Sequence, residues 1–154
     1  KGPLKCLNEA RYGIAWGVLG AARDSFNAAL DYTSERTQFG APLTHSQITQ
    51  VKLADMAVGI NKGFHTAIHI GRLADQGKLT PEIISVGKLD NTRMAIDVAR
   101  GARAMLGGNG ATLDYSPFRH AANLEAVRTY EGTDEVHQLT LGRSLTGVGV
   151  FALS

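Results

Sequence analysis

The sequence predicts an all-α protein, folded as an antiparallel four-helix bundle with one short extra helix before the last helix. Apolar residues recur every three or four positions through four long segments, which is the spacing of an amphipathic helix. No segment alternates apolar and polar residues over the length of a strand. Short breaks rich in glycine or proline separate the segments, so consecutive helices are expected to run antiparallel. The 154 residues, 44% of them apolar, suit a single domain with a hydrophobic core.

The first helix is expected from about residue 8 to residue 36, and the break at residues 38–42 ends it. Its apolar stripe consists of Ala15, Leu19, Ala22, Phe26 and Ala29. A second face carries Gly13, Gly17 and Gly20, each of which costs helix stability relative to alanine. This face predicts that another helix packs very close to the first one.

The second and third helices are predicted from their end signals. Residues 44–47 (THSQ) resemble a capping box, and Gly77 is a typical helix end, so the second helix is expected between them. Residues 80–82 (TPE) combine a capping threonine, a proline in the first turn and an acidic residue, which indicates the start of the third helix. The glycine-rich residues 107–110 are expected to end it.

The last third of the chain is less regular. A short helix is expected at about residues 118–124, followed by a last helix that Thr133 caps and that runs to about Gly147. The apolar tail at residues 148–151 is expected to dock on another part of the protein.

Composition excludes several classes of protein. The net charge of +2 comes without a dense basic block, so no nucleic-acid partner is expected, and no run of eighteen apolar residues predicts a membrane span. The single cysteine, Cys6, cannot form an internal disulfide, which favours a reducing compartment. His65 and His69 have helical spacing, but Thr66 stands where a zinc-binding HExxH motif needs glutamate, so no metal site is predicted.

The candidate catalytic group is Glu131, which precedes Gly132 directly before the last helix. A turn would hold this carboxylate near the free N–H groups of the helix, and Gly132 leaves space for a substrate. The spacing alone fits a solvated acid that completes a helix cap equally well. The glycines at residues 107–110 follow a helix and lack the lysine of a phosphate-binding loop, so on their own they indicate a helix end and a turn.

Four motifs in this order resemble the acyl-CoA dehydrogenase family over essentially the whole chain: NEAR at residues 8–11, ERTQFG at 35–40, LGGNG at 106–110 and YEGT at 130–133. Within the family, the sequence is most similar to the glutaryl-CoA dehydrogenases, through LNEARYGIAWG at 7–17, HAANLEAV at 120–127 and LGRSLTG at 141–147. The resemblance implies that residues 1–154 form the C-terminal helical domain. The family's N-terminal helical domain and middle β-domain are absent from this chain.

The resemblance assigns Glu131 as the base that removes the α-proton of an acyl-CoA thioester, while the β-hydride goes to FAD. Other members place the base on the first helix, where this chain has Ala10; the adjacent Glu9 is rotated by about 100° around the helix. Ala104 and Glu135 occupy positions where many members carry glutamine. The residues implied in FAD binding are Arg36, Phe39, Gln47, Ala104, Met105, Leu106, Gly107, Gly108, Thr133 and Phe151. Those implied in substrate binding are Leu7, Asn8, Arg11, Tyr130 and Gly132.

The implied activity of the full-length protein is the oxidative decarboxylation of glutaryl-CoA to crotonyl-CoA. The implied partners are three further copies in a homotetramer, with a neighbouring bundle contacting the FAD diphosphate, and an electron-transfer flavoprotein. The implied location is the cytoplasm of a bacterium or the mitochondrial matrix of a eukaryote. Two alternatives stay open: a dehydrogenase of another short-chain acyl-CoA, and a non-catalytic helical module for oligomerisation. The isolated chain is expected to lack activity and to bind FAD poorly.

Overall fold

Five α-helices account for most of the residues that the computed structural model describes, which are residues 2–149. The helices are α1 (Gly2–Glu35), α2 (Gln47–Asp75), α3 (Pro81–Met105), α4 (Ser116–Thr129) and α5 (Asp134–Thr146). Two short strands, β1 (Thr37–Gln38) and β2 (Ala41–Pro42), pair antiparallel after α1, and short 3-10 helices lie at Leu43–His45 and Asn109–Ala111. The all-α prediction is confirmed. No helix in the described part of the chain has the length and apolar character that crossing a membrane would require.

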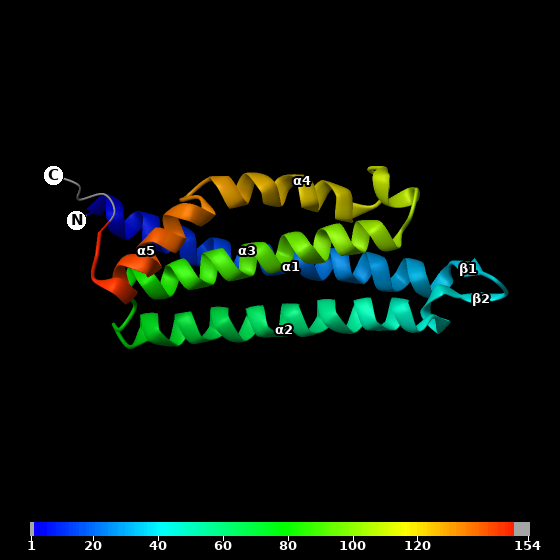
Figure 1. Ribbon diagram of the computed structural model, residues 1–154, viewed down its shortest axis with the longest axis horizontal. Helices are drawn as coiled ribbons and strands as arrows, with labels where there is room; N and C mark the ends of the chain where they lie inside the picture. Colours follow the sequence, from blue (N-terminus) through cyan, green and yellow to red (C-terminus); the bar gives the residue numbers. More distant parts are fainter. Residues whose placement is uncertain (1, 150–154) are drawn as a thin grey trace.

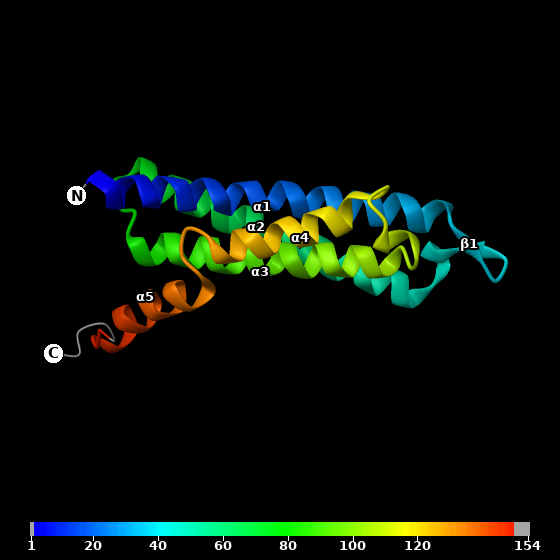
Figure 2. The ribbon, with the colours of Figure 1, turned by 90° about the horizontal axis from the view of Figure 1, so that it is seen from above.

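The helices α1 to α4 form a bundle in which consecutive members run in opposite directions (Figure 1). The pair α1 and α3 lies at the centre, with α2 packed on one side of the pair and α4 on the other. The last helix, α5, packs on α3 and diverges from the bundle axis (Figure 2). The turn between α4 and α5 therefore lies over α3, close to the N-terminal ends of α1 and α3.

The core is built from small and branched side chains of all four bundle helices. Its buried members include Val18, Ala22, Met56, Ile60, Ala95, Ile96, Ala99 and Leu124. Two glycines inside helices let the helices approach closely. A Cβ atom on Gly63 would lie 2.7 Å from Leu19 Cδ2, and one on Gly87 would lie 2.2 Å from Ile70 Cδ1. Close packing thus offsets the cost of glycine in these helices.

Several helix ends are as predicted. The Thr80 side chain accepts a hydrogen bond from Ile83 N at the start of α3, and the Thr133 side chain caps α5 in the same way. Gly77 and Gly147 follow the ends of α2 and α5 with positive φ angles of 65° and 73°. These local signals were sufficient because both groups of each cap lie within a few residues of one another.

Other expectations were wrong in detail. Residues 44–47 do not form a capping box: Thr44 lies in a 3-10 helix, and the Ser46 side chain makes no cap hydrogen bond. The helix expected at 118–124 is α4, which has 14 residues and belongs to the bundle. The β1–β2 hairpin was not foreseen, because two residues per strand are too few to show an alternating pattern.

The prediction that a second helix covers the glycine face of α1 was wrong. A Cβ atom on Gly13, Gly17 or Gly20 would meet no atom of the described residues within 4 Å. Gly13 and Gly17 instead line an open groove between α1 and α4. No second helix of residues 2–149 packs on this face.

Candidate active site

The turn between α4 and α5 holds the predicted base in an unusual backbone conformation. Glu131 has a φ angle of 55° and Gly132 has one of 96°, so two consecutive residues are in the left-handed region. A side chain at positive φ is strained, and it persists only where surrounding contacts fix it. Those contacts come from the neighbouring helices α1 and α3.

Cationic side chains bind three successive carbonyl groups of this turn. Lys88 Nζ, on α3, donates to the carbonyl oxygens of Tyr130 at 2.9 Å and Gly132 at 2.6 Å. Arg11 Nε, on α1, donates to the carbonyl oxygen of Glu131 at 2.9 Å. Hydrogen bonds from charged donors are stronger than neutral ones, so the chain itself fixes the path of the turn.

Lys88 is 0% exposed. Burial lowers its pKa, and the nearby charge of Arg11 acts in the same direction. The carboxylates of Asp134 and Glu131 oppose this shift. The Lys88 ammonium is thus satisfied mainly by backbone carbonyl groups, with acidic side chains at longer range.

The carboxylate of Glu131 is half-buried, and its Oε2 atom is fully buried without a hydrogen-bond partner among the described residues. Buried carboxylate oxygens in folded proteins nearly always accept hydrogen bonds, so an unpartnered one indicates a function or a missing partner. An oxygen without a protein donor keeps its lone pairs available to accept a proton. That Glu131 acts as a base stays a prediction.

His137 lies beneath the turn, one turn into α5. Its Nδ1 atom is 3.1 Å from Ser85 Oγ, and its Nε2 atom is buried without a partner among the described residues. Burial, together with the positive charges of Lys88 and Arg11, lowers the pKa of His137 to about 4. The imidazole is therefore neutral at physiological pH. A Cβ atom on Gly132 would lie 3.1 Å from His137 Nε2, so this position has little room for a side chain.

The first turn of α5 is tied to two bundle helices through Asp134, which is 2% exposed. Its Oδ2 atom lies 2.9 Å from Arg93 Nε on α3 and 2.9 Å from Arg128 Nε on α4. Next to it, the Thr133 hydroxyl caps the helix and lowers the pKa of the exposed Glu135 carboxyl. These contacts fix the start of α5 independently of the lysine below the turn.

A second group of predicted residues lies at the opposite end of the bundle. Arg36 and the segment from Ala104 to Gly108 line one open cavity of ≈ 350 Å³, together with Tyr32 and Asn109. The amide of Asn109 donates to the Tyr32 hydroxyl at 3.1 Å. The Leu106 side chain is buried in the core, so only its backbone can reach this cavity. The structure thus brings together six residues predicted to bind FAD.

The remaining FAD-binding candidates are spread out. Phe39 lies at the tip of the β1–β2 hairpin with a φ angle of 53° and is fully exposed, and Gln47 is the exposed first residue of α2. Both are at the end of the bundle that carries Arg36 (Figure 1). Thr133 lies at the other end, beside Glu131. Phe151 lies outside the described residues.

The substrate-binding candidates are divided as well. Arg11 and Gly132 lie beside Glu131, and Leu7 is one helical turn before Arg11 on α1. Tyr130 is half-exposed and lines the groove of ≈ 470 Å³ between α1 and α4. Asn8 instead lines a cavity at the α2–α3 turn, together with Glu9. The alternative acid Glu9 is therefore on a different face from the turn that holds Glu131.

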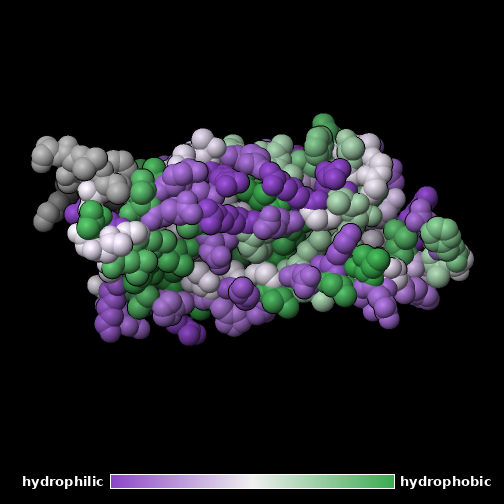
Figure 3. Space-filling model, in the orientation of Figure 1, coloured by the Kyte–Doolittle hydropathy of each residue, from purple (hydrophilic) through white to green (hydrophobic). Residues whose placement is uncertain are grey.

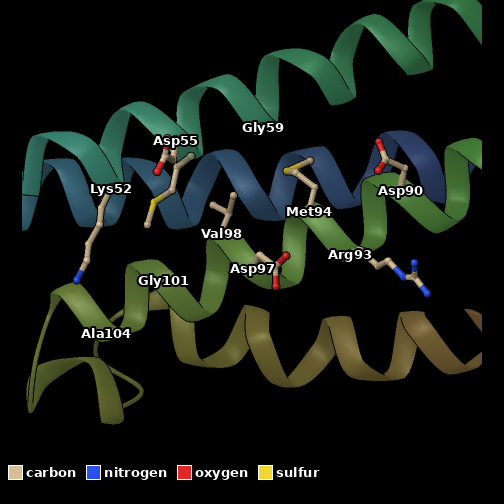
Figure 4. A pocket seen from close by; sticks show the side chains of 11 residues that line it. Lys52, Asp55, Gly59, Asp90, Arg93, Met94, Asp97, Val98, Gly101 and Ala104 are labelled. Atoms are coloured by element: carbon tan, nitrogen blue, oxygen red, sulfur yellow. The ribbon is translucent and has the colours of Figure 1, made fainter. Parts of the chain in front are cut away.

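A groove of ≈ 490 Å³ between α2 and α3 was not predicted from the sequence (Figure 4). Met56 and Met94 line it, and each packs against a glycine: a Cβ atom on Gly59 would lie 3.2 Å from Met94 Cγ, and one on Gly101 would lie 2.8 Å from Met56 Cε. Acidic and basic side chains surround it: Lys52, Asp55, Asp90, Arg93 and Asp97. Figure 3 shows hydrophobic residues exposed among hydrophilic ones over these two helices.

Sequence reasoning missed the residues that support Glu131, which are chiefly Lys88, His137 and the pair of arginines around Asp134. For Lys88 a signal existed, because it falls on the apolar stripe of α3, four residues after Ile84. A lysine on a buried stripe indicates a specific partner. Within residues 2–149, His, Cys, Asp and Glu side chains form no group of three or more that could hold a metal ion.

Comparisons with known proteins agree with the arrangement of the bundle. A family model described as "Acyl-CoA dehydrogenase, C-terminal domain" matches residues 3–146. The chain is 56% identical to glutaryl-CoA dehydrogenase from Mycobacterium smegmatis, of which a complex with FADH2 is also solved. Those structures match 97% of this chain with a TM-score of 0.94, and the match covers 38% and 39% of the solved chains.

More distant relatives belong to the same family. The chain is 33% identical to an acyl-CoA dehydrogenase of Bacillus subtilis (strain 168) and 32% identical to the mitochondrial short-chain specific acyl-CoA dehydrogenase of Homo sapiens. Both matches cover 92% of this chain but only 37% and 34% of the relatives, so the chain spans about a third of their length. The chain belongs to the acyl-CoA dehydrogenase family, whose C-terminal domain it matches along nearly all of its length.

Proposed function

We propose that this chain is the C-terminal domain of an FAD-dependent acyl-CoA dehydrogenase and that Glu131 is its catalytic base. The observation that carries the proposal is the buried, unpartnered Oε2 atom of Glu131, on a turn fixed by Lys88 and Arg11. A helical module that serves only for assembly has no need of such a group, which costs stability. A catalytic base does need such an oxygen, because a carboxylate oxygen that already accepts a hydrogen bond from the protein accepts a proton from the substrate less readily.

The chemistry of the turn follows from the acidity of its substrate. The α-proton of a thioester is much less acidic than a carboxylic acid, so a carboxylate removes it only where hydrogen bonds stabilise the charge that develops on the thioester oxygen. The resemblance to the family assigns one of these donors to the backbone N–H of Glu131. When bound, FAD supplies the acceptor for the β-hydride. The protein's part is to hold the carboxylate and this N–H on either side of the same thioester.

Glutaryl-CoA is the substrate we propose, with decarboxylation to crotonyl-CoA after the oxidation. The support is the 56% identity to the Mycobacterium smegmatis glutaryl-CoA dehydrogenase over 97% of this chain, against 32% to the human short-chain enzyme. The resemblance to the family implies that the groups binding the distal carboxylate of glutaryl-CoA lie outside this domain. A dehydrogenase of another short-chain acyl-CoA is the second candidate.

The distance between the two clusters bears on how FAD would bind. Arg11 lies on α1, and Arg36 directly follows the last residue of this helix, Glu35. The two arginines are 25 positions apart, which corresponds to about 37 Å at 1.5 Å per residue. One FAD molecule cannot span this distance. We therefore propose that the base end of one bundle and the Arg36 end of a neighbouring bundle contact the same FAD. The resemblance to the family implies that the copies assemble as a homotetramer. The uncovered glycine face of α1 fits this proposal, because a further domain or copy can pack on it.

The cavity at the Arg36 end suits the cofactor chemically. The Arg36 guanidinium matches a diphosphate in charge and geometry, and the exposed backbone of Gly107 and Gly108 permits close approach. Electrons from the reduced cofactor would pass to an electron-transfer flavoprotein. The proposed location is the cytoplasm in a bacterium or the mitochondrial matrix in a eukaryote.

The substitution Glu131→Gln in the full-length protein tests the proposal. We expect the variant to retain FAD but to lose flavin reduction by glutaryl-CoA by a factor of about 10² to 10⁴, the usual contribution of a general base. Stopped-flow absorbance of the flavin measures this rate, and Glu125→Gln, on the surface of α4, is the matched control. A native rate in Glu131→Gln would show that the base is another residue.

The wild-type protein in the same assay separates the alternatives. Reduction by glutaryl-CoA with release of carbon dioxide supports the proposed substrate. Reduction by butyryl-CoA alone would support the short-chain enzyme. No reduction by any acyl-CoA, in a protein that holds FAD, would support the non-catalytic module.

A further inference from the structure

We infer that Lys88 is a positioning residue for the catalytic base: it holds the 130–132 turn in the one conformation that aims the Glu131 carboxylate at the substrate. The inference rests on the proposed role of Glu131 and goes beyond it, because it concerns a fully buried lysine that binds the backbone of the turn. It assigns a function to the fully buried lysine of α3, which the reaction does not otherwise use.

The geometry of the lysine is specific to the conformation of the turn. One Nζ atom binds the carbonyl groups of Tyr130 and Gly132, on both sides of Glu131, at 2.9 and 2.6 Å. In extended backbone, the carbonyl oxygens of residues i and i+2 lie too far apart for one ammonium group to bind both, so the chain must bend at the residue between them. The positive φ angles of Glu131 and Gly132 produce this bend. Lys88 therefore stabilises the strained conformation that directs the Glu131 side chain.

A buried lysine destabilises the folded protein if its side chain serves only to fill volume in the core. Burying an ammonium group carries a desolvation penalty, and an apolar side chain of similar volume would avoid it. The direct partners of Lys88 are backbone carbonyl groups rather than a carboxylate. The buried charge of Lys88 thus stabilises the conformation of the turn rather than a salt bridge.

The attachment of α5 to the bundle does not depend on Lys88. Asp134 ties the first turn of α5 to Arg93 and Arg128, and His137 contacts Ser85 on α3. These contacts lie on the C-terminal side of the turn and would remain without the lysine. The contribution left for Lys88 is the local path of residues 130–132. Its loss should therefore displace the base more than it displaces the helices.

The expected effect is on the chemical step. A displacement of about 1 Å in a catalytic group lowers the rate of that step by about 100-fold. Affinity for acyl-CoA should change by only a few fold, because most of the substrate contacts lie elsewhere. A purely structural role predicts the reverse pattern: less folded holoenzyme, but a native rate for each bound flavin.

The test uses Lys88→Met in the full-length holoenzyme, because methionine fills a similar volume and cannot donate to the two carbonyl groups. The matched control is Lys62→Met, an exposed lysine on α2. The first measurement is the saturating rate of flavin reduction per bound flavin, with the dissociation constant for glutaryl-CoA from the same titration. The second is the exchange of the substrate α-hydrogen in deuterated water, followed by mass spectrometry, with the flavin reduced beforehand so that no hydride can be transferred.

We expect both rates in Lys88→Met to fall about 100-fold, with the dissociation constant within a few fold of the wild-type value. Native rates for reduction and exchange would overturn the inference. If Lys88→Met yields no holoenzyme, Lys88→Gln, whose amide can reach one carbonyl, takes its place and should give intermediate rates. A native rate in Lys88→Gln, or the failure of both variants to hold FAD, would show that the lysine acts in folding alone.

The same assays separate this inference from the proposed function. If wild-type protein neither reduces its flavin nor exchanges the α-hydrogen, or if Glu131→Gln does both at the native rate, the proposed function fails. If wild type is active, Glu131→Gln is inactive and Lys88→Met is native, only the positioning role of Lys88 fails.

Discussion

Glu131 and Phe39 have nearly the same positive φ angle, 55° and 53°, but opposite surroundings. At the base end of the bundle, hydrogen bonds from Lys88 and Arg11 fix the turn around Glu131. At the other end, Phe39 projects from a hairpin of two residues per strand and is 106% exposed. Tertiary contacts hold Glu131 at its positive φ angle, whereas a short hairpin holds Phe39 at its own.

The difference shows which part of the site the domain prepares by itself. A catalytic group must be held close to its productive position before the substrate arrives, and buried charged donors accomplish this at the base end. At the Arg36 end, by contrast, the side chain of Phe39 is exposed, and the β1–β2 pairing holds only the backbone of the hairpin. We expect substitutions at the base end to affect stability more than those at the Arg36 end.

The largest expected effect concerns the pH dependence of stability through His137. Its pKa is lowered from 6.5 to about 4 in the folded chain. Between these values the unfolded chain binds a proton at His137 and the folded chain does not, so the free energy of unfolding decreases as the pH falls from 6.5 to 4. The free energy of unfolding keeps its full value with respect to His137 above pH 6.5. Its decrease between pH 6.5 and pH 4 amounts to about 3 kcal/mol at most.

Urea denaturation of the 154-residue chain at several pH values measures this loss. The variant His137→Gln should show a shallower decrease in the free energy of unfolding over the same range, because the titrating group is absent. The control His45→Gln, an exposed residue at the Arg36 end, should follow the wild-type curve. Parallel curves for wild type and His137→Gln would mean that the imidazole is not held neutral in the folded chain.

Two glycines with positive φ provide a matched test of the two ends. Gly132, at φ 96°, lies against His137, whereas a Cβ atom on Gly107, at φ 59°, would meet nothing within 4 Å. Alanine in the left-handed region costs about 1 kcal/mol, and the crowded position should add about as much again. We expect Gly132→Ala to lower the free energy of unfolding by about 2 kcal/mol and Gly107→Ala by about 1 kcal/mol. Equal losses in urea denaturation would show that the packing of the base end contributes nothing.

The sequence predicted features whose partners are near in the chain. Thr80 and Thr133 cap their helices within three residues, and both were identified correctly. The start of α4 at Ser116 was missed although Pro117 marks it, because α4 buries only one narrow edge and its apolar spacing is weak. The false capping box at residues 44–47 shows the opposite error, a local signal that the adjacent hairpin overrides.

The candidate site was predictable only in part for the same reason. The resemblance supplied Glu131 as the base and Arg11 as a substrate-binding residue, and the structure places the two side by side. The partners of Lys88 were not predicted, because they are backbone carbonyl groups 42 and 44 residues away. Every residue has a backbone carbonyl group, so the sequence does not show which ones a side chain will bind. Contacts from a side chain to a distant backbone require the folded structure.

The smallest expected effect on stability is that of Phe39→Gly at the hairpin tip. Glycine relieves the strain of the positive φ angle but increases the freedom of the unfolded chain, and no buried contact is lost. We expect the free energy of unfolding to change by less than about 0.5 kcal/mol. In the full-length protein, however, FAD should bind about tenfold more weakly, because stacking of one aromatic side chain on a ring system is worth about 1–3 kcal/mol. Equilibrium dialysis of FAD measures the second effect. A loss of stability without a loss of FAD would reverse the assignment of the two ends, since it would make the hairpin part of the domain's own framework.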